Sequence, residues 1–284
     1  KASGTLARGV KIDRIVIDQE RVFIQLDGVA GRISLAPLMW QTIHSPDLTA
    51  ERPFVQVRRR LKPLPKRTPR FLPPGLSIRV DRAFVKAASL VATNGRRFDG
   101  TDVQTSGVAR HRTIRFFEAS FVMDAMRISG NSTLRAADPM QLEVDARALV
   151  RMTGQPVWIM AGTASGDLGS LDITAQLNAP FRADFAGRAQ DLTRGWKWSG
   201  KTRVHDFDLR AWGGGGALGQ VSGTLEMRGD AKGFSAAGPL TPAGLRAGAF
   251  QTRFEGSYAA RVVSARRIDV VHRGSRAHLT GAGT

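Results

Sequence analysis

Cysteine is absent from the 284 residues of the chain. Its absence excludes disulfide-stapled scaffolds, thiol nucleophiles and cysteine-ligated zinc sites or clusters. No apolar run reaches the roughly 18 residues that a membrane-spanning helix needs, and aromatic residues make up only 7% of the chain. Hydrophobic residues nevertheless account for 42% and charged residues for 23%. This composition is typical of a globular protein and excludes global disorder.

Acidic residues are also scarce, with 24 Asp and Glu against 42 Lys and Arg, and the formal net charge is +18. Such a charge first indicates a nucleic-acid partner. Nucleic-acid binding, however, needs a recognition helix or aromatic residues interleaved with the positive charge, and only Phe71 lies near the most basic segment. We therefore predict no nucleic-acid partner and assign most of the charge to the solvated face of a sheet.

The strongest periodic signal has period two. Leu142, Val144 and Ala146 alternate with polar residues, and the same alternation recurs along most of the chain. Because successive side chains of a strand point to opposite faces, the pattern predicts sheets with one apolar and one polar face. Turn signals recur about every ten to fifteen residues, a spacing that favours consecutive antiparallel strands. One short helix is predicted, over residues 36–43.

A basic, proline-rich segment interrupts this pattern at residues 58–74 (RRRLKPLPKRTPRFLPP). Its prolines lack the backbone donors that a central strand requires. The segment therefore predicts an exposed loop between an N-terminal β unit with the short helix, residues 1–57, and a long β region, residues 75–284. Its basic residues are candidate contacts for anionic lipid headgroups: Arg58, Arg59, Arg60, Lys62, Lys66, Arg67 and Arg70.

An alternating sheet of this length can hide its apolar face in two ways, and the composition does not separate them. Two sheets can pack into a closed sandwich or barrel. Alternatively, one sheet of about twenty strands, spaced roughly 4.8 Å apart, can curl into an open trough on the order of 100 Å long. A trough of this kind suits acyl chains, since each methylene gains roughly 0.8 kcal/mol on leaving water.

No constellation of catalytic residues emerges from the sequence. The five histidines form no HExxH pair. Asp206 and Asp208 flank Phe207, as expected for solvated positions on a strand. The GGGALG run at residues 214–219 lacks the strand and helix that would make it a dinucleotide-binding turn. From these residues we predict no catalytic site, no metal and no cofactor.

The order of the features resembles the TamB family, the inner-membrane-anchored subunit of the bacterial translocation and assembly module, with the related AsmA-like proteins. The resemblance lies first in GVKIDRIVIDQERVFIQLDGVAGRISLAPLMWQTIHSPDLTAERPFVQVRRRLKPLP, where two strands, a short Leu-rich helix and a further strand lead into a basic, Pro-rich loop. The restart LPPGLSI and the stretch GDLGSLDITAQLNAPFRADFAGRAQDLTRGWKWSGKTRVHDFDLRAW also resemble that family. The resemblance covers most of the chain.

The resemblance implies an all-β fold: an elongated, curved, mainly antiparallel sheet that forms an open groove, or half-pipe, with an apolar interior. It implies a periplasmic segment that is not an enzyme, conducts phospholipids between the inner and outer membranes of a Gram-negative bacterium and supports outer-membrane biogenesis. In the full-length protein, a preceding segment would anchor the chain in the inner membrane. A following C-terminal part would engage a TamA-like outer-membrane barrel.

Acyl chains would then lie on the apolar parity of the strands. The candidate lining residues are Ile78, Val80, Leu142, Val144, Leu171, Ile173, Leu177, Phe181, Phe185, Phe207, Leu209, Val221, Leu225 and Met227. Two alternatives remain open at this point. One is a scaffold or chaperone for outer-membrane protein (autotransporter) assembly without lipid conduction, and the other is a β-sandwich that binds or degrades polysaccharide.

Overall fold

The computed structural model describes residues 2–5, 9–18, 22–34, 36–57, 70–91, 95, 97–151, 156–167, 169–191, 196–208, 219–230, 232–243, 248–259, 262–273 and 275–279. The chain forms two compact units. The first comprises Lys1–Gln155 with Ser165–Leu168, and the second comprises Pro156–Ala164 with Gly169–Thr284. The described part of both units is almost entirely β-strand, which confirms the predicted all-β class.

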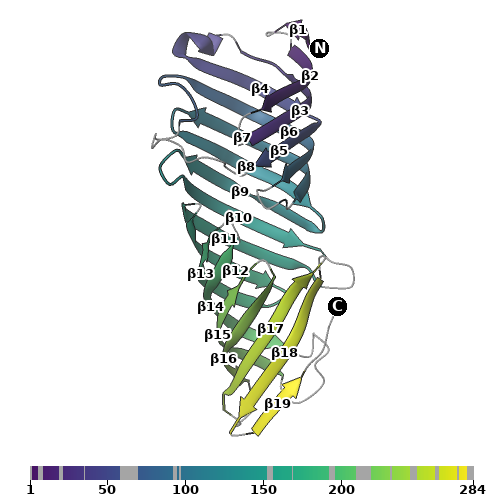
Figure 1. Ribbon diagram of the computed structural model, residues 1–284, viewed down its shortest axis with the longest axis vertical. Helices are drawn as coiled ribbons and strands as arrows, with labels where there is room; N and C mark the ends of the chain where they lie inside the picture. Colours follow the sequence, from purple (N-terminus) through teal and green to yellow (C-terminus); the bar gives the residue numbers. More distant parts are fainter. Residues whose placement is uncertain are drawn as a thin grey trace. The chain divides into compact units, whose positions relative to one another are not determined.

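The first unit contains ten strands, which Figure 1 shows as a curved sheet. They are β1 (Ala2–Thr5), β2 (Gly9–Asp18), β3 (Val22–Gly31), β4 (Thr42–Ala50), β5 (Arg52–Val57), β6 (Ser77–Val91), β7 (Arg97–Arg110), β8 (Thr113–Met123), β9 (Met126–Arg135) and β10 (Gln141–Val150).

Strand β11 (Trp158–Asp167) is divided between the two units. The second unit continues with β12 (Ser170–Ala179), β13 (Arg182–Gln190), β14 (Lys197–Asp208), β15 (Gln220–Gly229), β16 (Gly233–Pro242), β17 (Phe250–Ala259), β18 (Val262–His272) and β19 (Ser275–Leu279). From β12 to β19 each strand pairs antiparallel with the next, so the predicted antiparallel order is confirmed here.

The first unit departs from this order at one place, because β4 and β5 both pair with β6 in parallel. Thr42 lies opposite Ser77, and Val55 lies opposite Leu90. Backbone hydrogen bonds thereby join residues 42–57 to the strand that follows the basic segment. The two compact units divide around residues 156–169, and residues 58–69 of the basic segment lie outside the described residues.

The helix predicted over residues 36–43 is shorter than expected. It is a single 3-10 turn, η1 (Ala36–Trp40). Thr42 and Ile43 already belong to β4, where they pair with Ser77 and Ile78. The ladder to β6 therefore ends the helix.

The burial of side chains distinguishes an open sheet from a closed sandwich. Among the described residues, the buried hydrophobic side chains are Ala136, Leu171, Ala183, Ala189, Val221, Ala236 and Leu240, and Val221 is the only large one that is fully buried. A closed sandwich would bury large side chains from both of its layers. No pairing among the described strands closes β12 onto β19. The apolar face of each sheet is therefore uncovered along much of its area.

Candidate functional site

The apolar face of the first unit is a set of rows that run across the strands. Residues that lie directly opposite one another share a face of the sheet. One row contains Ile78, Ala109, Ile114, Leu134 and Leu142, and the next contains Val80, Gly107, Phe116, Ser132 and Val144. The four lining residues predicted in this unit, Ile78, Val80, Leu142 and Val144, therefore lie on one face, and all four are half-buried.

The second unit repeats this arrangement across β12 to β17. One row contains Ile173, Gly187, Gly200, Met227, Ala236 and Phe254, and another contains Leu177, Ala183, Val204, Gly223, Leu240 and Phe250. The predicted residues Phe185 and Leu225 occupy the row between these two, and Leu171 occupies the row on the other side of Ile173 on the same face. Val221 lies opposite Phe207. The predicted residue Leu209 lies outside the described residues.

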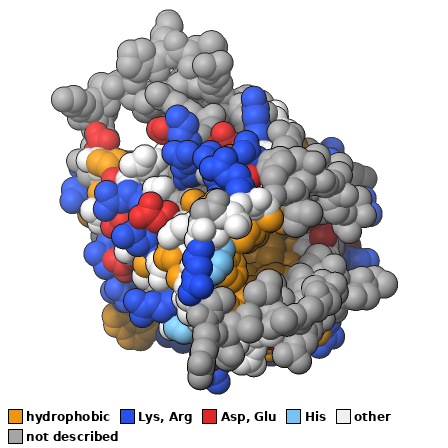
Figure 2. Space-filling view, turned by 90° about the horizontal axis from the view of Figure 1, so that it is seen from below, with side chains coloured by type: hydrophobic (Ala, Val, Ile, Leu, Met, Phe, Trp, Pro, Cys, Tyr) orange, Lys and Arg blue, Asp and Glu red, His pale blue; other side chains and the backbone are white. Residues whose placement is uncertain are grey.

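The apolar face of the second unit borders a hollow. Figure 2, which views the molecule from below, shows hydrophobic side chains gathered inside a hollow and Lys, Arg, Asp and Glu on the outer surface. The half-buried state of Ile173, Leu177 and Leu225 agrees with this view. Large apolar side chains on this face therefore remain accessible to a ligand.

Three aromatic rings meet on this face near the turn between β12 and β13. The rings of Phe181 and Phe207 lie 4.6 Å apart, and those of Phe181 and Trp158 lie 5.9 Å apart, both in edge-to-face contact. Phe207 reaches this position through a bulge in β14 between Val204 and Phe207. The cluster provides a rigid apolar surface, because edge-to-face contacts stabilise such rings beyond their burial.

Glycine gives this face a feature that the sequence alone did not reveal. Gly187 and Gly200 lie opposite each other, and the ring of Phe185 covers both. Its Cζ atom is 2.6 Å from the place where a Cβ of Gly187 would stand. The ring can lie against the backbone only because neither glycine has a side chain. The register of β13 and β14, which the sequence does not specify, is needed to find this arrangement.

The opposite face of each sheet carries the charge. Arg188 Nε donates to Asp172 Oδ1 at 2.7 Å, and both side chains are more than half exposed. This hydrogen bond raises the pKa of Arg188. Lys201 and Glu226 form a similar exposed pair. In β12 to β15 the charged side chains thus lie on the face opposite the apolar rows.

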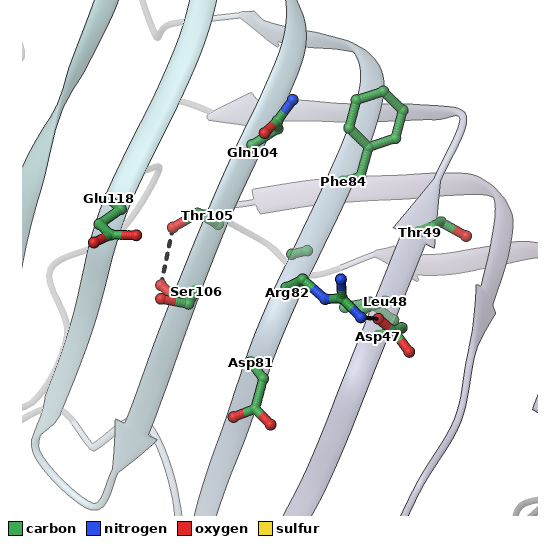
Figure 3. Close-up of a pocket in the computed structure, with 11 residues that line it drawn as sticks. Asp47, Leu48, Thr49, Asp81, Arg82, Phe84, Gln104, Thr105, Ser106 and Glu118 are labelled. Carbon is green, nitrogen blue, oxygen red and sulfur yellow. Dashed lines mark hydrogen bonds and ion pairs between the residues drawn. The ribbon is translucent and has the colours of Figure 1, made fainter.

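A depression of about 550 Å³ lies on the polar face of the first unit, where β4, β6, β7 and β8 adjoin (Figure 3). Asp47 of β4 lies between two arginines, since it accepts hydrogen bonds from Arg32 and, at 2.8 Å, from Arg82. The hydrogen bond from Arg32, followed by the charge of Arg82, lowers the pKa of the Asp47 carboxyl. The parallel pairing of β4 with β6 places Asp47 directly opposite Arg82.

The neighbouring charges of this depression are paired in the same way. Asp81 accepts hydrogen bonds from His44, at 2.7 Å, and from Arg79, at 2.8 Å, and these lower its pKa. Figure 3 shows Asp81, Arg82 and Phe84 following one another along β6. Because Asp47 and Asp81 are already paired with neighbouring cations, they stabilise the junction of β4 with β6.

Of the predicted basic residues, one lies within the part of the chain that the structure describes. Arg70 is exposed, whereas Arg58, Arg59, Arg60, Lys62, Lys66 and Arg67 lie outside the described residues. Among the histidines, His205 bonds to Asp184 and His111 to the Leu72 carbonyl. Within the described ranges, no three His, Asp or Glu side chains come together as metal ligands.

No helix in the described part of the chain is long and apolar enough to cross a membrane. Comparisons with protein-family models, with curated proteins and with solved structures each find no match.

Proposed function

We propose that this chain is a periplasmic segment of a TamB-like protein that carries phospholipids between the inner and outer membranes, with their acyl chains on the apolar faces of its sheets. One observation supports the proposal above all others. Ile173, Leu177 and Leu225 are large apolar residues on a shared face, yet they remain half-exposed. Covering such an apolar surface with the methylene groups of an acyl chain is favourable by roughly 25 cal/mol per Å² of surface removed from water.

The character of the face also supports conduction over tight binding. The two rows of the second unit described above contain aliphatic residues, Ala, Gly, Met and Phe, and they contain no charged residue. A ligand that contacts only apolar atoms has no directional bond to break when it shifts along the sheet. Headgroups would remain in water at the open side, where they keep their hydration.

The test is lipid extraction and native mass spectrometry of the purified chain. We expect phospholipid to accompany the wild-type chain. The double variant Ile173→Asp with Leu225→Asp should carry at least about tenfold less, because each carboxylate must otherwise be desolvated against an acyl chain. The matched control is Gln176→Asp with Gln220→Asp, which adds the same charge on exposed positions of the polar face. It should retain its lipid.

Two results would overturn the proposal. One is a wild-type chain without phospholipid, and the other is equal lipid in the two double variants. Photo-crosslinking from position 173 distinguishes the scaffold alternative. Crosslinks to nascent outer-membrane proteins, with none to lipid, would replace conduction by a chaperone role.

A further inference from the structure

The two most exposed large hydrophobic side chains among the described residues, those of Met39 and Trp40, are neighbours in sequence, and Leu38 precedes them. Leu38, Met39 and Trp40 of η1 are 45%, 85% and 72% exposed. Exposure of two such residues side by side is costly, because full burial of a Met side chain stabilises by about 1.5–3 kcal/mol. A cluster of this kind marks a surface that contacts an apolar partner.

Hydrogen bonds on the C-terminal side of η1 hold this cluster in place. Gln41, which has a positive φ of 55°, donates from its backbone N–H to the Leu38 carbonyl at 2.9 Å. The Gln41 carbonyl accepts from Ser77 N–H at 3.0 Å. Strand β4 then begins at once. The backbone after η1 is therefore fixed to β6, and it presents the three side chains outward in a defined place.

Three arginines lie at the same edge of the first unit. The starts of β4 and β6 and the end of β7 adjoin there, as Thr42 lies opposite Ser77 and Ile78 lies opposite Ala109. Arg110 and Arg112 flank His111 in the turn after β7, and both are exposed. The backbone N–H of Phe71 donates to the His111 carbonyl at 2.9 Å, which brings the exposed Arg70 to the same turn.

The charge of this edge is positive in sum. In the part of the chain that the structure describes, no ion pair involves Arg70, Arg110 or Arg112. The other charged groups on the neighbouring connections are Arg135, which pairs with Glu143 at 3.3 Å, and the exposed Asp138. A partner that complements this edge must offer negative charge together with apolar groups.

We propose that this edge docks the first unit on the surface of an anionic phospholipid bilayer. Leu38, Met39 and Trp40 enter the boundary between headgroups and acyl chains, where Trp is favoured because its ring is amphipathic. Arg70, Arg110 and Arg112 pair with headgroup phosphates, which guanidinium groups contact with two parallel hydrogen bonds. Three inserted side chains give a shallow, reversible contact and not a permanent anchor.

The inference rests on the proposed function, because a lipid conduit must approach a bilayer to receive or deliver its cargo. A bilayer agrees with the observations better than a protein partner does. The apolar cluster is small and flanked by cations, as at interfacial membrane segments, whereas a stable protein interface buries a far larger apolar area.

The test is co-sedimentation of the purified chain with two kinds of vesicle, phosphatidylethanolamine containing phosphatidylglycerol and pure phosphatidylcholine. Replacement of Leu38, Met39 and Trp40 by Ser should weaken binding to both by at least about tenfold. Arg110→Gln with Arg112→Gln should weaken binding to the anionic vesicles by about tenfold and leave binding to phosphatidylcholine unchanged. The control, Phe84→Ser with Leu90→Ser, removes two other exposed apolar groups, 40% and 42% exposed, from β6 and should bind like wild type.

The readout separates this inference from the proposed conduit. Ile173→Asp with Leu225→Asp should lose bound lipid but still sediment with vesicles. Docking is refuted if the Ser variant sediments with vesicles like wild type, whatever its lipid content. It is also refuted if the wild-type chain sediments with neither kind of vesicle. Vesicle binding by a wild-type chain that carries no lipid refutes the conduit alone.

Discussion

The indole of Trp198 lies on the backbone of Gly229, the residue directly opposite it in the β14–β15 ladder. Three indole atoms, Nε1, Cε2 and Cζ2, are each 2.7 Å from the place where a Cβ of Gly229 would stand. Real Cβ contacts are longer than this, so the ring occupies space that any other residue would fill. The indole is in edge-to-face contact with Phe185, at 6.0 Å between ring centres.

This relationship predicts a strong coupling between the two positions. Gly229→Ala should destabilise the second unit by about 1–3 kcal/mol, because the added methyl displaces the indole. In a Trp198→Ala background the same substitution should cost almost nothing, since all three nearest atoms belong to Trp198. Urea unfolding of the two single variants and the double variant gives the coupling free energy, which we expect at about 1–2 kcal/mol.

Gly187 provides the contrasting control. A Cβ there would meet Phe185 Cζ at 2.6 Å, but it would also meet backbone atoms of Ser199 and Gly200. Phe185→Ala should therefore leave most of the cost of Gly187→Ala in place. If truncation of Phe185 relieved Gly187→Ala as fully as truncation of Trp198 relieves Gly229→Ala, the assignment of the clash to the backbone would be wrong.

The alternation in the sequence was sufficient to assign the faces of the strands. Ile173 and Leu177 fall on the apolar face, and Asp172 and Gln176 on the polar face, because a strand has period two whatever its neighbours are. The same alternation describes an open sheet and a closed sandwich equally well. Only the burial of particular residues, such as the half-exposed Leu225, distinguishes them.

Features that depend on pairing were beyond the sequence. The parallel ladder that brings Asp47 opposite Arg82 joins residues separated by a long segment. The bulge before Phe207 shifts the register of β14 locally, and Asp206 there takes a positive φ of 48°. Trp40 was expected within a longer helix, and its exposure follows from the early start of β4. In each case the missing information was the identity of the neighbouring strand.

An open apolar face predicts an unequal response to truncation. Val221 is only 1% exposed. Val221→Ala should therefore lower the free energy of unfolding by about 1–3 kcal/mol, as in an ordinary hydrophobic core. Ile173 is the larger side chain but is half-exposed, so Ile173→Ala should cost only about 1 kcal/mol, below the roughly 2–5 kcal/mol of a buried Ile. Chemical unfolding of delipidated protein measures both. A loss at Ile173 in the range of a buried residue would show that the face is covered.

The ion pairs of the polar face should contribute little despite their short distances. Arg188 and Asp172 are separated by 2.7 Å, yet their side chains are 56% and 64% exposed. Pairs exposed to this degree are screened by water and salt. Arg188→Gln should therefore leave the thermal unfolding midpoint nearly unchanged at physiological salt. A marked fall in that midpoint would mean that the polar face is desolvated, by a partner or by a further layer.

Asp47 should make stability depend on pH in the acid range. Its pKa is lowered from 3.8, first by the hydrogen bond from Arg32 and further by the charge of Arg82. A carboxyl whose pKa is lower in the folded state contributes its full stabilisation above the unfolded value, and it loses this contribution as the pH falls through the folded value. Asp47→Asn should therefore lower the unfolding midpoint at neutral pH, and the difference from wild type should shrink as the pH falls below the ordinary titration range of an Asp carboxyl.

The two arginines beside Asp47 allow this cause to be checked directly. Arg32→Gln should reduce the pH-dependent difference more than Arg82→Gln does, because the hydrogen bond from Arg32 is the largest contribution to the lowered pKa. Unfolding midpoints at neutral pH and at about pH 2 for the three variants provide the comparison. A difference between wild type and Asp47→Asn that persisted undiminished at the lower pH would mean that Asp47 acts through packing. The ionised carboxylate would then have no part in joining β4 to β6.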